Sequence, residues 1–240
     1  MNTLSYVTEV PTQLGEVIRL VGDEGHHASR VLRLRKGEEH LLSDGRGRWS
    51  RTQVVDNDNR SVKLSVVESG FQIPRDISIT VVQGIVKSER TKENIELLVE
   101  AGVDRIVPWE ASRSVGKLPR GIEKLKLAVR ESGKQSRRFW LPDVADPVDT
   151  DRLLAIIRSA DFTLVLDAHA DAKLTEFFPN HQHIESIVLV IGPEGGITDE
   201  ELETMAAAGA QMAKLGRPIL RSSHAGIAAV AALSVALGLW

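Results

Sequence analysis

Two glycine-rich turns in the C-terminal third of the chain have the residue types best suited to holding a small molecule. The first is Gly192-Pro193-Glu194-Gly195-Gly196, directly after the apolar run 187–191, and the second spans 214–221 with Gly216 and Arg221. Glycine lets a backbone approach a ligand closely and reach positive φ. Turns that follow neighbouring strands form the ligand sites of open α/β sheets. The spacing therefore predicts one small-molecule pocket to which both turns contribute.

The side chains of the two turns narrow the kind of ligand. Glu194 would repel a pyrophosphate and suits a ligand with a positive or hydrogen-donating group. The first turn has neither the P-loop nor the G-x-G-x-x-G dinucleotide spacing. Ile219 and Leu220 could form an apolar wall. Arg221 stands at the start of a last apolar helix, and its place beside a glycine turn favours a functional role over a surface ion pair. The alternative for the first turn is a tight strand-to-helix connection without a ligand.

Several other kinds of chemistry are not expected. The chain has no cysteine, which excludes a disulfide framework, a cysteine nucleophile and cysteine metal ligands. Its seven histidines are scattered without an H-E-x-x-H motif, so no metal site is expected, and the lack of G-x-S-x-G argues against a serine hydrolase. The longest apolar run, 225–240, is too short to span a bilayer and is typical of a buried terminal helix. Without a basic stretch and apolar run at the N-terminus, a cytoplasmic location with no membrane partner is expected.

The charges are segregated along a chain whose formal net charge is only −3. One basic cluster runs from 113 to 138 with two opposing glutamates, and another lies within 30–51. Two basic surfaces on a mildly acidic protein indicate local docking of a polyanion, such as RNA. The alternative for either cluster alone is a solvated helix face.

The elements that would position the turns change in character near residue 73. Before it, short strands with Asp-Gly and Asp-Asn turns predict a small barrel or a strongly bent sheet, followed by a linker at 70–74. After it, strands alternate with helices, which predicts a mainly parallel sheet covered on both faces. Thr198, with Glu201 three residues later, predicts a capping box after the first turn. The expected strands are 17–20, 40–43, 51–55, 61–66, 77–86, 104–109, 162–167, 187–191 and 210–215, and the expected helices are 26–32, 91–101, 122–135, 151–159 and 199–208.

In their order and spacing, these motifs resemble the RsmE family of 16S ribosomal RNA uridine N3-methyltransferases, within the SPOUT class of S-adenosylmethionine-dependent enzymes. The resemblance covers nearly the whole chain. At position 224 this chain has His where members usually have Thr. The resemblance is carried by His26-His27, 30–33, 44–47, Gln83-Gly84, 87–90, 96–103, 130–138, 191–196 and 215–221.

This resemblance implies a fold, a cofactor and an assembly. The fold would be α/β, with a small PUA-like β-barrel domain that binds RNA at 1–72 and a SPOUT methyltransferase domain with a deep trefoil knot at 73–240. The protein would be a homodimer that binds S-adenosylmethionine in the predicted pocket. The expected cofactor-binding residues are Gly192, Pro193, Glu194, Gly195, Gly196, Leu215, Gly216, Ile219, Leu220 and Ala225.

The implied reaction is methylation of N3 of a uridine in the 16S ribosomal RNA of the small ribosomal subunit, with uridine 1498 as the family target. Uridine N3 carries a proton and is a poor nucleophile when neutral. Arg221 is therefore expected to stabilise negative charge on the uracil oxygens, and Glu194 to orient a donor group or take the proton, with no metal. RNA contacts are expected from Arg30, Arg33, Arg35, Lys36, Arg46, Lys87, Arg90, Arg113, Lys134, Arg137 and Arg138.

Three other functions compete with this interpretation. A related SPOUT enzyme could modify a different nucleotide. A ribosome-assembly factor could bind RNA without catalysis, and the unusual His224 keeps that hypothesis open. A nicotinamide-linked oxidoreductase is disfavoured because the phosphate-binding fingerprint is missing.

Overall fold

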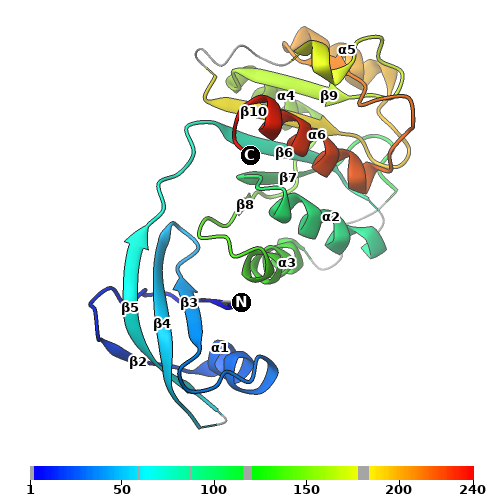
Figure 1. The fold of residues 1–240 in the computed structure, drawn as a ribbon. Coiled ribbons are helices and arrows are strands. Elements are labelled where there is room, and N and C mark those ends of the chain that lie inside the picture. Colours follow the sequence, from blue (N-terminus) through cyan, green and yellow to red (C-terminus); the bar gives the residue numbers. More distant parts are fainter. Residues whose placement is uncertain (1–2, 59, 87, 116–120, 178–183) are drawn as a thin grey trace. The chain divides into compact units, whose positions relative to one another are not determined.

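The computed structural model describes residues 3–58, 60–86, 88–115, 121–177 and 184–240. The chain forms two compact units: Met1–Pro74 with Arg130–Leu141, and Arg75–Val129 with Pro142–Trp240 (Figure 1). The first boundary lies two residues beyond the expected one. The sequence did not indicate that 130–141 would group with the first unit.

The first unit is built on one five-stranded sheet. Its strand order is β1-β3-β4-β5-β2, with β1 parallel to β3 and the other pairs antiparallel. All four strands expected before residue 72 are present, but β1 was missed. The expected helix at 26–32 corresponds to a π-helical turn at 27–31, and a short α-helix at 22–26 precedes it. The elements are β1 Thr3–Tyr6, β2 Val17–Leu20, α1 Gly22–His26, η1 His27–Val31, β3 Glu39–Ser43, β4 Arg48–Asn57 and β5 Val62–Phe71.

The core of this unit follows from the alternation of its strands. Leu42, Val54 and Leu64 are buried on the inner face, where Leu20 and Ala28 pack against them. The pairing of β4 with β5 shifts register twice, and such irregularities bend a sheet strongly.

The expected linker at 70–74 is partly wrong, because β5 continues to Phe71. Gly70 pairs with Trp49 of β4, and a Cβ on Gly70 would lie 2.8 Å from Trp49 Cζ2. Glycine at this position makes room for the indole and does not mark the end of the strand.

Residues 130–141 join the first unit through the end of α3, Ile122–Gln135, and the segment after it. Arg130 Nη2 donates to Tyr6 O at 2.7 Å and to Glu24 Oε1 at 2.8 Å, and Lys134 Nζ lies 2.9 Å from the same carboxylate oxygen. Burial opposes ionisation of Glu24, but hydrogen bonds from Lys134 and Arg130 outweigh it and leave its pKa below the ordinary value. The Tyr6 hydroxyl donates to Arg138 O at 2.7 Å. This segment is therefore part of the packing of the first unit.

The second unit is built on a six-stranded parallel sheet with the order β11-β9-β10-β6-β7-β8. The alternation of strands and helices expected after residue 76 is confirmed, while the short β8 was missed. The elements are β6 Ser78–Gly84, α2 Ser88–Glu100, β7 Arg105–Trp109, β8 Asp143–Val144, α4 Thr150–Ser159, β9 Phe162–Leu166, η2 Leu174–Phe177, β10 Ser186–Ile191, α5 Asp199–Ala207, β11 Gln211–Ala213 and α6 Ser222–Ala236.

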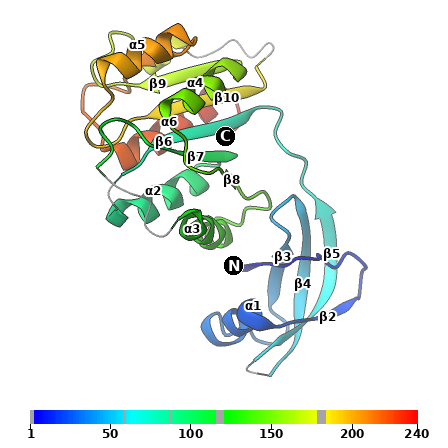
Figure 2. The same ribbon diagram turned by 180° about the vertical axis from the view of Figure 1, so that it is seen from behind.

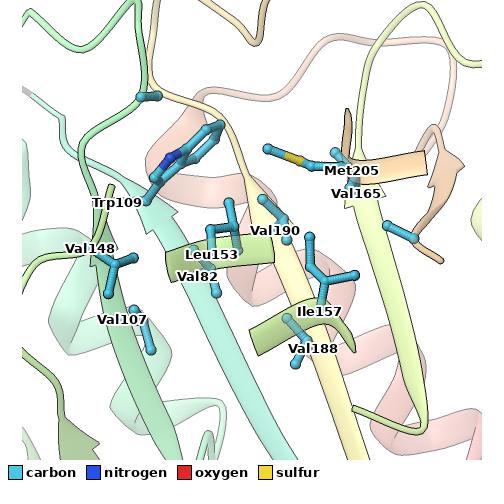
Figure 3. Close-up of a cluster of buried hydrophobic side chains, with 12 residues drawn as sticks. Val82, Val107, Trp109, Val148, Leu153, Ile157, Val165, Val188, Val190 and Met205 are labelled. Carbon is cyan, nitrogen blue, oxygen red and sulfur yellow. The ribbon is translucent and has the colours of Figure 1, made fainter. Parts of the chain in front are cut away.

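Helices cover both faces of this sheet, as the nearly unbroken apolar sequence of β10 requires. The helices α2 and α6 lie on one face, and α4 and α5 on the other (Figures 1 and 2). On the second face, Val82 and Val190 point from the sheet toward Leu153 and Ile157 of α4 (Figure 3). The two layers hold the carboxyl ends of β9, β10 and β11 side by side, which places the loops that follow them together. Among the described residues, no helix is both long and apolar enough to cross a membrane.

Candidate functional site

A pocket of about 660 Å3 opens where the loops after β9, β10 and β11 meet. Its volume lies within the range of roughly 300–1,000 Å3 that small-molecule sites occupy. Both predicted glycine turns line it, together with residues from α2, the loop after β7 and the start of α6. The lining residues include all ten that were expected to bind the cofactor, and also Arg221, Arg90 and Arg113.

The first glycine turn is shaped by close backbone contacts. A Cβ on Gly84, the last residue of β6, would lie 2.5 Å from Pro193 N, and a Cβ on Gly192 would lie 2.7 Å from Ile197 Cγ1. Gly196 has a φ of +76°, a conformation that side chains rarely adopt, and its N–H closes the turn onto Pro193 O at 3.0 Å. The glycines are thus required by the shape of the turn itself.

The capping box expected after this turn is confirmed. Thr198 Oγ1 accepts from Glu201 N, and the Glu201 carboxylate accepts from Thr198 N at 3.0 Å. The other oxygen of Glu201 accepts from Ser112 N at 2.8 Å, which ties the helix start to the loop after β7. Burial opposes ionisation of Glu201, but the hydrogen bonds from Ser112 and Thr198 outweigh it, so its pKa lies below the ordinary value.

The second glycine turn leaves the pocket open. Gly216 has no positive φ, and a Cβ there would meet only Pro218 Cδ, at 3.9 Å. Its role is therefore to leave space, not to allow an unusual backbone conformation. Ile219 is 79% exposed in this open pocket, and such an apolar surface suits the flat apolar part of a ligand.

Buried amide groups join the two turns. Ser222 Oγ, at the start of α6, donates to Gly192 O in the first turn and accepts from Gln83 Nε2 at 2.9 Å. Asn94 of α2 donates through Nδ2 to Gln83 Oε1 and to Ser223 O, both at 3.2 Å. Because Gln83 and Asn94 are buried, these bonds are shielded from water and fix the start of α6 against the first turn.

Charged groups of both signs lie around the pocket. The side chain of Glu194 is 22% exposed, and its Oε1 lies 3.7 Å from Arg90 Nη1. Arg113 Nη1 lies 3.4 Å from Gly195 O and from Ile197 O, so this guanidinium holds the first turn. Arg90 and Arg113 were expected to contact RNA, and the structure places both at the pocket.

Arg221 occupies the N-cap position of α6 but makes no side-chain capping bond. Its exposed side chain lines the pocket beside the second turn. His224 does not line the pocket; its Nε2 lies 3.6 Å from Glu93 Oε1 of α2. The unusual histidine is thus directed to a neighbouring helix.

Sequence reasoning missed the contribution of the loop after β9. Asp167, Ala168 and His169 line the pocket, and His169 Nδ1 lies 3.4 Å from Asp167 Oδ1. The available signal was the strand expected at 162–167, because the loops that follow neighbouring parallel strands meet at one edge of the sheet.

The other residues expected to bind RNA lie in the first unit, apart from Lys87, which is outside the described residues. Arg33 and Arg137 are exposed and both have a φ of +53°. Lys134 is only 10% exposed and lies 2.9 Å from both Glu24 and Glu131, so its charge is already used in packing. The exposed members of the group are Arg30, Arg33, Arg35, Lys36, Arg46 and Arg137, and Arg138 is partly exposed.

No group of three or more potential metal ligands is found in the part of the chain that the structure describes. The pocket instead offers an apolar wall, backbone groups of two turns and both acidic and basic side chains. Such a lining fits an organic ligand with polar ends.

Comparisons with known proteins all identify RNA methyltransferases. Residues 74–234 match the family model described as RNA methyltransferase domain, and residues 20–67 match the one described as RNA methyltransferase PUA domain. The chain is 35% identical to the ribosomal RNA small subunit methyltransferase E of Mycobacterium bovis, over 99% of this chain and 93% of the relative. It is 25% identical to the protein of the same name from Bacillus subtilis, over 97% of this chain and 93% of that one.

Solved structures agree with the sequence comparisons. The crystal structure of a ribosomal RNA small subunit methyltransferase E from Neisseria gonorrhoeae, bound to S-adenosyl methionine, matches with a TM-score of 0.87 and 25% identity. That match covers 100% of this chain and 98% of the Neisseria chain.

Proposed function

Because the chain belongs to the family of RNA methyltransferases that its residues 74–234 match, we propose that it methylates N3 of a uridine in 16S ribosomal RNA. Its general activity is S-adenosylmethionine-dependent methylation of ribosomal RNA. The finer proposal, with uridine 1498 as the target, rests on the RsmE resemblance. The single observation that carries the assignment of the site is the meeting of both glycine turns, with Arg221, in one pocket.

The residues present fit S-adenosylmethionine. The pocket has room for a ligand of this size, and Gly216 leaves its wall open where a side chain would intrude. Glu194 and Asp167 supply negative charge for a ligand that carries a sulfonium and an ammonium group. Exposed apolar side chains at Ile219 and Leu220 suit the flat face of an adenine.

When bound, S-adenosylmethionine supplies an electrophilic methyl group that is attached to its sulfonium sulfur. The protein has to place the uracil N3 in line with that methyl group and favour the deprotonated base. Arg221 is assigned the second task, because its guanidinium lines the pocket and is not used to cap α6. A fixed positive charge there would stabilise the negative charge that develops on the uracil oxygens.

Glu194 is assigned a role in orienting the ligand, and its carboxylate is a less favoured acceptor for the N3 proton. Arg90 Nη1 lies 3.7 Å from Glu194 Oε1, and this ion pair holds the carboxylate at the edge of the pocket, which supports an electrostatic role for it. Arg113 is assigned a positioning role, since its guanidinium faces the carbonyl oxygens of the first turn.

RNA binding is assigned to the first unit, which is basic. PUA-domain similarity over residues 20–67 and the exposed arginines at 30–48 and 137 support contacts to phosphates of the small ribosomal subunit. A ribosomal RNA substrate supports a cytoplasmic location for the protein. The homodimer and the deep trefoil knot are carried over from the RsmE resemblance, and the exposed Val235 and Trp240 at the C-terminus suit a contact with a second copy.

Methylation of isolated subunits tests this proposal. The protein is incubated with radiolabelled S-adenosylmethionine and small ribosomal subunits from a bacterial strain that lacks the enzyme, and the label is located by nuclease mapping and mass spectrometry. We expect one N3-methyluridine, at position 1498 of the 16S RNA. Label on another nucleotide would favour a related enzyme with a different target. No cofactor binding by calorimetry would favour a non-catalytic assembly factor.

A further inference from the structure

Aromatic side chains gather at one place in the first unit, where the chain segment after α3 pairs with the turn between β3 and β4. Gly47 N donates to Phe139 O at 2.8 Å, and Leu141 N donates to Gly45 O at 2.9 Å. Two ring pairs form along this segment. Trp49 stacks on Phe139 with ring centroids 5.4 Å apart, and Phe71 meets Trp140 edge to face at 5.9 Å. The chain has only four tryptophans, one tyrosine and five phenylalanines, so four of its aromatic residues lie in this cluster.

Glycines hold the indole rings close to the backbone. A Cβ on Gly47 would lie 2.7 Å from Trp140 Cζ2, and Trp140 Nε1 donates to Gln72 O at 2.8 Å. The indole of Trp140 is thereby fixed on its backbone side. Phe71, which meets it edge to face, remains 53% exposed. A fixed aromatic surface that faces solvent is the arrangement on which unpaired nucleic-acid bases stack.

Three arginines lie near the exposed pair, two through backbone pairing and one in sequence. Arg48 is the direct cross-strand partner of Phe71, and Arg46 forms a bridge with Trp140. Arg137 lies three residues before Trp140, and the side chains of all three arginines are exposed. Arginines beside an aromatic surface give it the charge that a phosphate backbone requires.

Arg137 has a backbone conformation that normally favours glycine. Its φ of +53° places it in the left-handed region just after α3, where Arg137 N bonds to Lys134 O and Arg138 N to Gly133 O. Glycine is the residue that stabilises this helix ending, and any other side chain there costs stability. Glycine in place of this exposed arginine would therefore relieve the backbone strain, while it would remove a positive charge from the surface.

We propose that Phe71 and Trp140 form a stacking surface for an unpaired base of the RNA, with Arg46, Arg48 and Arg137 holding its flanking phosphates. This inference rests on the proposed function, because it takes the RNA substrate from it. The surface lies in the first unit and is separate from the residues of the methyl-donor pocket, which all belong to the second unit. It binds single-stranded RNA in preference to duplex, since paired bases cannot stack on a protein ring.

Fluorescence of a short single-stranded RNA with the adenine analogue 2-aminopurine tests the stacking, with the same RNA annealed to its complement as reference. We expect binding to the full-length protein to quench the 2-aminopurine fluorescence of the single strand and not that of the duplex. Phe71→Ala should weaken binding of the single strand by about 5- to 100-fold, the effect of losing one base–aromatic stack. Phe71→Tyr should restore it. Ile73→Ala is the matched control, because Ile73 is 80% exposed two residues along and lies outside the ring pairs.

Arg137→Gly separates RNA binding from folding. We expect it to raise the Tm by about 2–4 °C, because glycine fits the left-handed backbone. The same change should lower the slope of log K against log salt concentration by about 0.7, which is the loss of one phosphate contact. A variant that is more stable yet binds RNA less tightly cannot be explained by damage to the fold.

The possible failures are distinguishable. Phe71→Ala with wild-type affinity and quenching would overturn the stacking surface, while methylation by the wild-type protein would leave the proposed function intact. If Phe71→Ala bound whole subunits less tightly but free RNA with unchanged affinity, the rings would contact a ribosomal protein and not RNA. This result would also overturn the inference. Wild-type protein that binds no RNA at low salt would overturn both.

Discussion

Replacing Gly84 by alanine tests whether the pocket depends on the close approach of β6 to the first glycine turn. The new Cβ would lie 2.5 Å from Pro193 N, 2.6 Å from Pro193 Cδ and 2.9 Å from Gly192 C. Real Cβ atoms essentially never come within 3.0 Å of another heavy atom, and none of these three atoms belongs to a flexible side chain. The turn must therefore move by about 0.5–0.9 Å to restore a separation of 3.0–3.4 Å.

Such a shift has two measurable consequences. Overpacking by one methyl group costs about 1–3 kcal/mol of unfolding free energy. A displacement of roughly 1 Å near the reacting groups lowers turnover by about 100-fold. We expect Gly84→Ala to lower the Tm of the protein, weaken S-adenosylmethionine binding in calorimetry and reduce the initial rate of subunit methylation.

Gly216→Ala provides the matched comparison. Its Cβ would meet only Pro218 Cδ, at 3.9 Å, so the protein itself has room for it. We expect an unchanged Tm together with weaker cofactor binding, because the methyl group enters the pocket. Wild-type affinity and turnover in Gly84→Ala would refute the view that the position of the first turn limits catalysis.

Four other substitutions test the pocket, the buried amide groups beside it and a buried histidine of the first unit. Arg221→Ala should lower methyl transfer by about 100- to 1,000-fold with an unchanged Tm, and near-normal turnover would remove Arg221 from the mechanism. Gly195→Val should abolish cofactor binding in calorimetry, because its Cβ would lie 2.9 Å from Arg113 O. Asn94→Ala should lower both the Tm and turnover, since Gln83 loses its buried partner; unchanged turnover would exclude a positioning role. Burial lowers the pKa of His40 to about 4, so the protein should lose up to roughly 3 kcal/mol of stability as pH falls from about 6.5 to 4, and His40→Gln should flatten Tm against pH there.

Local patterns in the sequence predicted much of the second unit. The helix expected at 122–135, whose first half belongs to this unit, has those bounds in the structure, and the capping box at Thr198 and Glu201 forms as expected. These features depend on neighbours within a few positions, which the sequence displays directly. The pocket itself could be expected because the carboxyl ends of neighbouring parallel strands meet at one edge.

Long-range contacts account for what was missed. Strand β1 is only four residues long and is held by β3, 37 positions later, so no local period marks it. Glu201 reaches Ser112 N from 89 positions away, and Lys134 is drawn into packing by Glu24. The basic run at 113–138 therefore combines residues with different roles: Arg113 at the pocket, Lys134 in a largely buried ion pair and Arg137 at the surface.

The return of residues 130–141 to the N-terminal unit limits how the protein can be divided. A gene fragment that ends after codon 74 encodes a β domain without the partners of Tyr6 and Glu24 and without the segment that carries Phe139 and Trp140. A fragment that starts there carries residues 130–141 without Tyr6 and Glu24, their hydrogen-bond and ion-pair partners. An exchange of the first unit between homologous chains would therefore have to replace two separate stretches of sequence at once.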